Sequence, residues 1–246
     1  MKNKTLIFLA VIFIIASVLR FWQLGKTPIS PDWDEVSLGY NAYSIMQTGK
    51  DEYGESFPIV LRSFDDYKQA LYAYLSIPSI FIMGLTVEAV RLPSVVFGIL
   101  TVLATFFLVD EVFKRKDLAL LSSFLLAISP WHIQFSRIAF ESNVGLALNV
   151  FSVLFFIKGV KKPLFLLLYT LCAGLSLYMY QSEKVFVPLL FILLVFIYRS
   201  ELFKLPKKYL VLSLIIGIII AFPIAHYTLT KKEALTRAQG VSVFSE

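Results

Sequence analysis

Residues 92–131 read LPSVVFGILTVLATFFLVDEVFKRKDLALLSSFLLAISPW, and this stretch decides the fold. It holds two apolar runs, 92–113 and 118–131, joined by a short basic turn. A helix needs about 20 mainly apolar residues to cross the roughly 30 Å of hydrocarbon in a bilayer. The first run has that length and the second is shorter, and together they predict two consecutive transmembrane helices.

Similar runs recur along the chain of 246 residues, which is 58% hydrophobic and only 16% charged, whereas about a quarter of a soluble domain is charged. The N-terminal run begins like a signal peptide but lacks a small-residue cleavage site, so we expect it to be retained. We predict an all-α, polytopic integral membrane protein with about seven transmembrane helices. The candidate spans are residues 5–22, 92–113, 118–131, 144–157, 163–180, 185–198 and 209–225.

The connection between the first two spans, residues 23–90, carries most of the acidic residues. Residues 34–48 are compatible with a helix that ends at Gly49. Residues 68–83 are apolar and aromatic enough to lie in the membrane interface or to re-enter the membrane, and an additional span at 68–84 is the alternative. We therefore predict a loop that contains short interfacial helices.

The distribution of charge predicts the orientation. The connections on the N-terminal side hold 12 of the 23 basic residues against four acids, which gives that side a charge of +8 and the other side −2. Because cytoplasmic loops are enriched in lysine and arginine, the N-terminus is expected in the cytoplasm and the 23–90 loop outside. The basic balance then reflects a cell-membrane protein in contact with lipids and requires no nucleic-acid partner.

Two adjacent acids lie near the start of the outer loop. Asp34 and Glu35 could act as a base toward a hydroxyl or amine, or ligate a divalent cation. Neighbouring positions on a helix point about 100° apart, so the two acids are expected to have different roles. The alternative is a solvated helix N-terminus, where acids favour the helix dipole.

Three cations lie near the outer ends of separate elements. Lys68, Arg137 and Lys184 have the side chains that usually bind phosphate, and a lipid phosphate in the outer leaflet would meet them. The alternative is that they snorkel to headgroups. Arg137 is also four residues before Glu141, a spacing that allows an ion pair on one helix face.

His132 and Tyr72 belong to the same predicted membrane face. A metal site at His132 would require ligands from other spans, because both histidines are isolated in sequence. Aromatic residues such as Tyr72 suit sugar rings and isoprenoid tails, although belts of aromatic residues also anchor proteins at the interface.

Five stretches together resemble the membrane glycosyltransferases of the GT-C superfamily, in the branch of protein mannosyltransferases and aminoarabinose lipid A transferases. They occur in the family's order and cover nearly the whole chain. The stretches are PDWDEVSLGYNAYSIMQTGKDEYGESFP (31–58), KQALYAYL (68–75), RLPSVVFGILTVLATFFLVDEVF (91–113), SPWHIQFSRIAFESN (129–143) and YMYQSEKVFVPLL (178–190).

The resemblance implies roles for individual residues. Asp34 matches the catalytic loop acid, Glu35 its acidic neighbour and Glu141 a second acid, while Lys68 matches a phosphate-contacting lysine. Gln69 and Ala70 replace the family's usual prolines, and Lys184 stands where many bacterial relatives have arginine. The predicted site therefore has catalytic acids and substrate-binding residues, namely Asp34, Glu35 and Glu141 in the first group, and Lys68, Arg137, His132, Tyr72 and Lys184 in the second.

The resemblance implies an inverting transfer of one sugar from a polyprenyl-phosphate donor to a protein, lipid or glycan acceptor on the outer face, with a divalent ion as a possible aid. Family enzymes usually have further spans, so residues 1–246 resemble a single N-terminal module. The alternatives are a transporter and a non-catalytic membrane subunit or scaffold. Transport predicts charges in the middle of spans, and these spans are almost free of them.

Overall fold

The structure is a computed structural model that describes residues 2–64 and 66–231. Its described part consists of helices and a single two-stranded antiparallel sheet. The elements are α1 (Lys2–Phe21), α2 (Trp33–Thr48), β1 (Val60–Ser63), β2 (Asp66–Gln69), α3 (Leu71–Met83), α4 (Val87–Phe113), α5 (Lys116–Ile128), α6 (Pro130–Ser136), α7 (Glu141–Lys161), α8 (Phe165–Ser176), α9 (Glu183–Ile197), α10 (Arg199–Leu202) and α11 (Lys207–Thr230).

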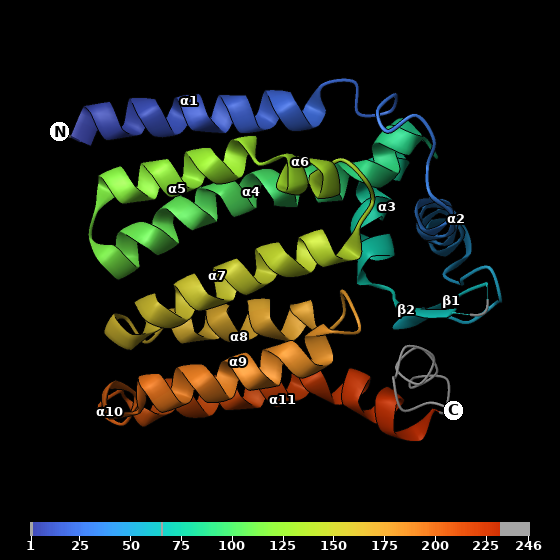
Figure 1. Ribbon diagram of the computed structural model, residues 1–246. Helices are drawn as coiled ribbons and strands as arrows, with labels where there is room; N and C mark the ends of the chain where they lie inside the picture. The colour runs from blue at the N-terminus through green and yellow to red at the C-terminus, as the bar shows by residue number, and fades with distance from the viewer. Residues whose placement is uncertain (1, 65, 232–246) are drawn as a thin grey trace, which may run out of the picture.

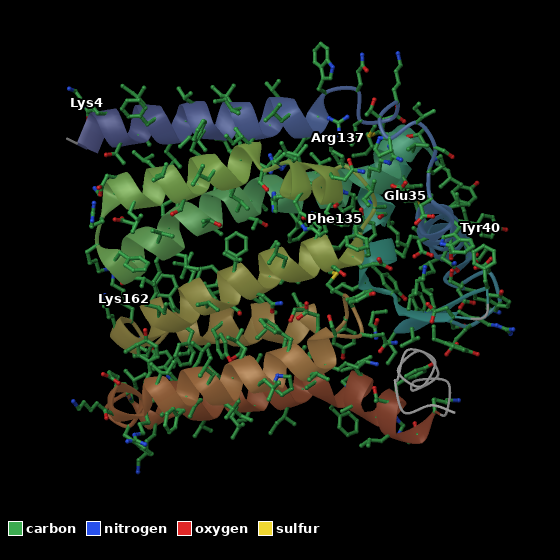
Figure 2. The ribbon with its side chains drawn as sticks, viewed as in Figure 1. Lys4, Glu35, Tyr40, Phe135, Arg137 and Lys162 are labelled. Atoms are coloured by element: carbon green, nitrogen blue, oxygen red, sulfur yellow. The ribbon has the colours of Figure 1, made fainter. Side chains whose placement is uncertain are left out.

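The long apolar helices run beside one another and alternate in direction, so the chain returns to the same two ends of the bundle (Figure 1). One end carries α2, the sheet and α3, together with the connections before α7 and α9. Glu35 and Arg137 lie at this end, whereas Lys4 and Lys162 lie at the other (Figure 2). The basic connections are therefore separated from the first loop, as the charge distribution predicts.

Each of the seven predicted spans is largely helical, which confirms the predicted fold class but not the number of spans. Four helices, α1, α4, α7 and α11, are long and apolar enough to cross a membrane. A fifth span results if α5 and α6, which meet at a bend of 60°, are counted together. At 12 and 15 residues, α8 and α9 are shorter than a full crossing requires.

The break between α5 and α6 is stabilised by the buried Arg20. Pro130 has no N–H, so the carbonyl of Leu126 loses its usual donor four residues later. The Arg20 Nη2 lies 3.4 Å from this carbonyl, and its Nη1 donates to Ala127 O at 3.1 Å. The predicted span 118–131 is therefore a helix pair, and Arg20 of α1 donates to two carbonyls in the last turn of α5.

The first loop forms a cap over its end of the bundle. Figure 1 shows α3 crossing the ends of the long helices, so this stretch lies across the bundle and does not add a parallel span. The strands β1 and β2 form a hairpin in which Leu61 is opposite Lys68. Sequence analysis did not predict these strands, and the all-α description needs this small correction.

Gly98 on α4 provides the space in which α6 packs. A Cβ atom at this position would lie 2.3 Å from Ser136 Oγ and 2.7 Å from Ser136 Cβ. We therefore expect Gly98→Ala to displace α6 and to lower the free energy of unfolding by about 1–3 kcal/mol. Thermal unfolding in detergent would measure the loss. Val96→Ala, on an exposed face of α4, is the control and should cost clearly less; equal melting temperatures for the two variants would contradict the close packing.

Candidate active site

Glu35 fixes the start of α2 against the bundle. Its carboxylate accepts hydrogen bonds from Arg91 Nε and Nη2, both at 2.8 Å, and from the backbone N–H of Ala139 at 2.6 Å. It also accepts from the N–H of Asp32 at 3.1 Å, as the second half of a capping box. Both Glu35 and Arg91 are buried, so this carboxylate is fully engaged in joining α2, α4 and the segment before α7.

Arg91 extends the anchor to the segment that precedes α2. Its Nη1 donates to the carbonyls of Leu24 at 2.9 Å and Pro28 at 3.0 Å, while Nη2 lies 3.4 Å from Ser30 O. The guanidinium therefore binds both the acid on α2 and the chain that leads into it. Sequence analysis did not single out Arg91. The one feature that could have indicated its role is its position as a lone arginine at the start of the apolar run 92–113.

Asp34 has a different environment from its neighbour, as the helical geometry predicts. Its carboxylate forms an ion pair with Lys68 on β2. The Asp34 side chain is 36% exposed, whereas the Lys68 side chain is only 6% exposed. Because Glu35 holds α2 in place, Asp34 is presented at the surface beside a buried ammonium group. The carboxylate of this ion pair is therefore open to solvent on one side, while its ammonium group is enclosed.

The hairpin that carries Lys68 contacts the connection between α8 and α9. Gln181 Nε2 donates to the carbonyl of Tyr67 at 3.1 Å, immediately before Lys68 in the chain. Three residues after Gln181, the Lys184 Nζ is buried and has no hydrogen-bond acceptor within residues 2–64 and 66–231. A buried ammonium without an acceptor is costly, so Lys184 is suited to bind an anion.

Arg137 is bound to the backbone at the end of α1 and the start of the first loop. Its Nη1 donates to Leu19 O at 2.7 Å, and its Nη2 donates to Trp22 O at 2.6 Å and Thr27 O at 2.9 Å. Burial, and secondarily the positive charge of Arg91, lower the pKa of the Arg137 guanidinium. Both terminal nitrogens are therefore engaged in holding the exit from α1.

His132 pairs with Arg20 inside the bundle. Arg20 Nη2 lies 2.7 Å from His132 Nδ1, and because a guanidinium can only donate, Nδ1 must accept. The ring proton is then on Nε2, which is buried and has no partner in the described part of the chain. The structure thus places His132 with α1 and α6 and does not bring it to the Asp34–Lys68 pair.

Tyr72 and Glu141 are also buried at this end of the bundle. Tyr72 is fully enclosed in the core, and its hydroxyl donates to Val90 O at 3.0 Å, so it presents no surface to a substrate. Burial, and to a lesser extent the charges of Glu141 and Glu35, raise the pKa of Tyr72 well above its usual value. Glu141 is the first residue of α7, where an acid favours the helix dipole.

An apolar groove of about 390 Å³ lies between the first loop, α8 and α11. Its wall from the first loop includes Ile59 and, two and three residues after Lys68, Ala70 and Leu71, while Tyr178 borders its other side. The Tyr178 hydroxyl donates to Ile220 O on α11 at 2.5 Å. The groove is lined by Ile59, Ala70, Leu71, Tyr74, Leu175, Tyr178, Ile219, Ile220 and Pro223.

The structure shows no group of three or more His, Cys, Asp or Glu side chains that could hold a metal ion within its described residues. The sequence analysis left open whether a divalent ion takes part in the reaction, and the described side chains do not supply a ligand set for one.

Comparison with known proteins identifies the family of the chain. The profile of the dolichyl-phosphate-mannose-protein mannosyltransferase family matches residues 70–227. A comparison with curated proteins gives no match. The fold is similar to that of the archaeal oligosaccharyltransferase AglB from Archaeoglobus fulgidus in complex with an inhibitory peptide and a dolichol-phosphate, with a TM-score of 0.65 and 17% identity. The match covers 89% of this chain and 29% of that chain, so the chain spans less than a third of the relative's length.

The fold and the family match define a multi-pass membrane protein of the GT-C superfamily of glycosyltransferases. The chain belongs to the dolichyl-phosphate-mannose-protein mannosyltransferase family, which confirms the resemblance seen in the sequence. The matched range begins at residue 70. Asp34 and Lys68 precede this range and lie in the first loop.

The anchor predicts a specific response to removal of its cation. Arg91→Met should leave the Glu35 carboxylate buried without its ion pair and lower the free energy of unfolding by about 3–5 kcal/mol. Thermal unfolding of the purified protein would measure this loss. The double variant Arg91→Met/Glu35→Gln should recover part of it, because the remaining buried group is neutral. A double variant no more stable than Arg91→Met would contradict the account of the anchor.

Proposed function

We propose that this chain carries the catalytic centre for transfer of a sugar from a polyprenyl-phosphate donor to an acceptor hydroxyl or amine. The observation that carries the proposal is the Asp34–Lys68 pair, a partly exposed carboxylate beside a buried ammonium on a loop anchored by Glu35 and Arg91. The family match supports the class of reaction. In the similar archaeal structure, a dolichol-phosphate and a peptide are bound to the longer protein.

Asp34 is proposed as the general base. The acceptor hydroxyl attacks the anomeric carbon of the donor sugar from the face opposite the phosphate, and Asp34 takes the hydroxyl proton. The bond between the anomeric carbon and the phosphate oxygen breaks, and its electron pair leaves with the polyprenyl phosphate. The anomeric configuration is therefore inverted. A base must lie within hydrogen-bond reach of the proton it removes, which the exposed Asp34 side chain allows.

Lys68 and Lys184 are proposed to bind the donor phosphate. An ammonium group has three donors, so Lys68 can contact Asp34 and still donate to phosphate oxygens. Lys184 has a buried Nζ without an acceptor among the described residues, and a phosphate would supply one. Charge on the departing phosphate grows as the glycosidic bond breaks, and fixed cations stabilise that charge. The two lysines would thus act on the leaving group.

The apolar groove is proposed to hold the first isoprene units of the donor. Its walls include Ala70 and Leu71, which follow Lys68, and Tyr178 in the connection before Lys184, together with residues of α8 and α11. An isoprenoid chain is purely apolar, and burial of each CH₂ contributes about 0.8 kcal/mol. The groove would therefore align the lipid with the phosphate site.

The remaining sequence candidates are proposed to act through position. Glu35 orients α2, and Arg137 holds the exit from α1, through the contacts described above. His132 supports the same region through Arg20. Glu141 is proposed as a second acid at the edge of the site. We further propose that this end of the bundle faces the outside of the cell, because the opposite end carries the basic connections.

Asp34→Asn tests the base directly. The substitution removes the proton acceptor while barely changing the volume, so the transfer rate should fall roughly 100-fold or more. The assay would use the full-length protein in membranes with a polyprenyl-phosphate sugar, with expression measured in parallel. Asp117→Asn, an exposed acid at the other end of the bundle, is the control and should transfer normally. Near-normal transfer by inserted Asp34→Asn protein would remove Asp34 from this role.

The orientation can be tested with single cysteines in a Cys172→Ala background. Ser56→Cys lies in the exposed part of the first loop and should react with a membrane-impermeant thiol reagent in sealed cells. Lys116→Cys lies at the opposite end and should react only after permeabilisation. The reverse pattern would place the proposed site in the cytoplasm.

A further inference from the structure

The start of α9 contains another buried acid, Glu183. Its side chain is 7% exposed, and its Oε2 accepts a hydrogen bond from Asn149 Nδ2 on α7 at 2.8 Å. The described structure gives it no lysine or arginine partner within ion-pair distance. Transfer of a carboxyl group out of water into a membrane bundle is costly. A buried acid without a cationic partner is therefore expected to have a specific role.

The bundle is shaped to receive this carboxyl group. Gly145 lies one turn before Asn149 on the same face of α7, and a Cβ atom at Gly145 would lie 3.0 Å from Glu183 Oε1. A larger side chain there would press on the carboxylate. Gly145 and Asn149 therefore form a recess on α7, one by leaving space and the other by donating a hydrogen bond.

The contact fixes the segment that carries Lys184. Gln181 binds the carbonyl of Tyr67 on β2, and Glu183 binds Asn149 on α7, so the chain is held on both sides within three residues. Lys184 is the next residue, and adjacent helical residues point about 100° apart. Its Nζ is buried and has no acceptor in the described chain. The first turn of α9 thus holds one side chain in place and leaves the next one unpaired.

We propose that Glu183 is a positioning residue for the donor phosphate, which sets the position of the Lys184 ammonium by hydrogen bonding to Asn149 in the recess at Gly145. This inference rests on the proposed function, in which Lys184 binds the phosphate. Glu183 acts through its hydrogen bond and not through its charge, because Asn149 requires only an acceptor. In this arrangement Glu183 holds the chain in position and Lys184 contacts the substrate, just as Glu35 holds α2 in position and Asp34 contacts the acceptor.

The kinetic test compares two substitutions of Glu183. Glu183→Leu removes the acceptor and should raise KM for the polyprenyl-phosphate sugar roughly 10-fold, with a smaller change in kcat, because the buried Asn149 amide loses its acceptor and the start of α9 is no longer held. Lys184→Met should have the same kind of effect. Glu183→Gln keeps an oxygen for Asn149 and should remain near wild type. In a Lys184→Met background, Glu183→Leu should add little. Glu201→Leu, an exposed acid at the other end, is the matched control.

Three results would overturn the positioning role. These are an unchanged KM in Glu183→Leu, an equal defect in Glu183→Gln and Glu183→Leu, and multiplicative effects of Glu183→Leu and Lys184→Met. Equal defects would mean that the charge itself acts. Multiplicative effects would mean that the two residues act independently.

A second measurement separates this inference from the proposed function, because it needs no transfer. Lys184→Cys in a Cys172→Ala background should react slowly with a thiol reagent, since the position is held in a buried setting. Asn149→Leu should accelerate that reaction several-fold, and Glu201→Leu should not. If wild-type protein transfers no sugar, the proposed function fails. A faster thiol reaction in Asn149→Leu would still support the inference that the Glu183–Asn149 hydrogen bond fixes the start of α9. An unchanged reaction rate in Asn149→Leu would overturn it.

Discussion

The buried ion pair between Glu35 and Arg91 is the interaction on which the candidate site depends. It joins residues separated by 56 positions and connects α2 to the long apolar helix α4. Removing two charges from water is expensive, and the cost is recovered only when the geometry is good and further hydrogen bonds satisfy the pair. Here the carboxylate also receives two backbone N–H groups, and the guanidinium donates to backbone carbonyls. The result is a fixed direction for α2, which places Asp34 against Lys68.

The same end of the bundle uses arginine repeatedly to bind backbone carbonyls. Arg20 binds the carbonyls freed at the α5–α6 break, and Arg137 binds those at the exit from α1. Irregular backbone near a membrane must find hydrogen-bond partners within the protein. These arginines supply such partners, so they hold the loops from which a substrate-binding surface can be built. Lysine is given the other role in the proposed mechanism, in which the ammonium groups of Lys68 and Lys184 bind the donor phosphate.

The sequence predicted the helices well because each arises from a local property, a run of apolar residues long enough to be recognised alone. It also predicted that Asp34 and Glu35 would differ, since that follows from helical geometry. It did not predict the roles of Arg91, Arg20 or Glu183, because their partners lie far away in the chain. The hairpin at residues 60–69 was missed for a related reason. Its strands have only four residues each, and Lys68 is buried by packing that no local pattern reveals.

The most direct test of the central claim is an experimental structure of the full-length protein with a polyprenyl phosphate bound in a lipid nanodisc. The account predicts that the phosphate lies within hydrogen-bond distance of the ammonium groups of Lys68 and Lys184, that the lipid follows the groove past Ala70 and Tyr178, and that the Glu35–Arg91 pair is intact. A phosphate bound at Arg137 or His132, away from the Asp34–Lys68 pair, would contradict it.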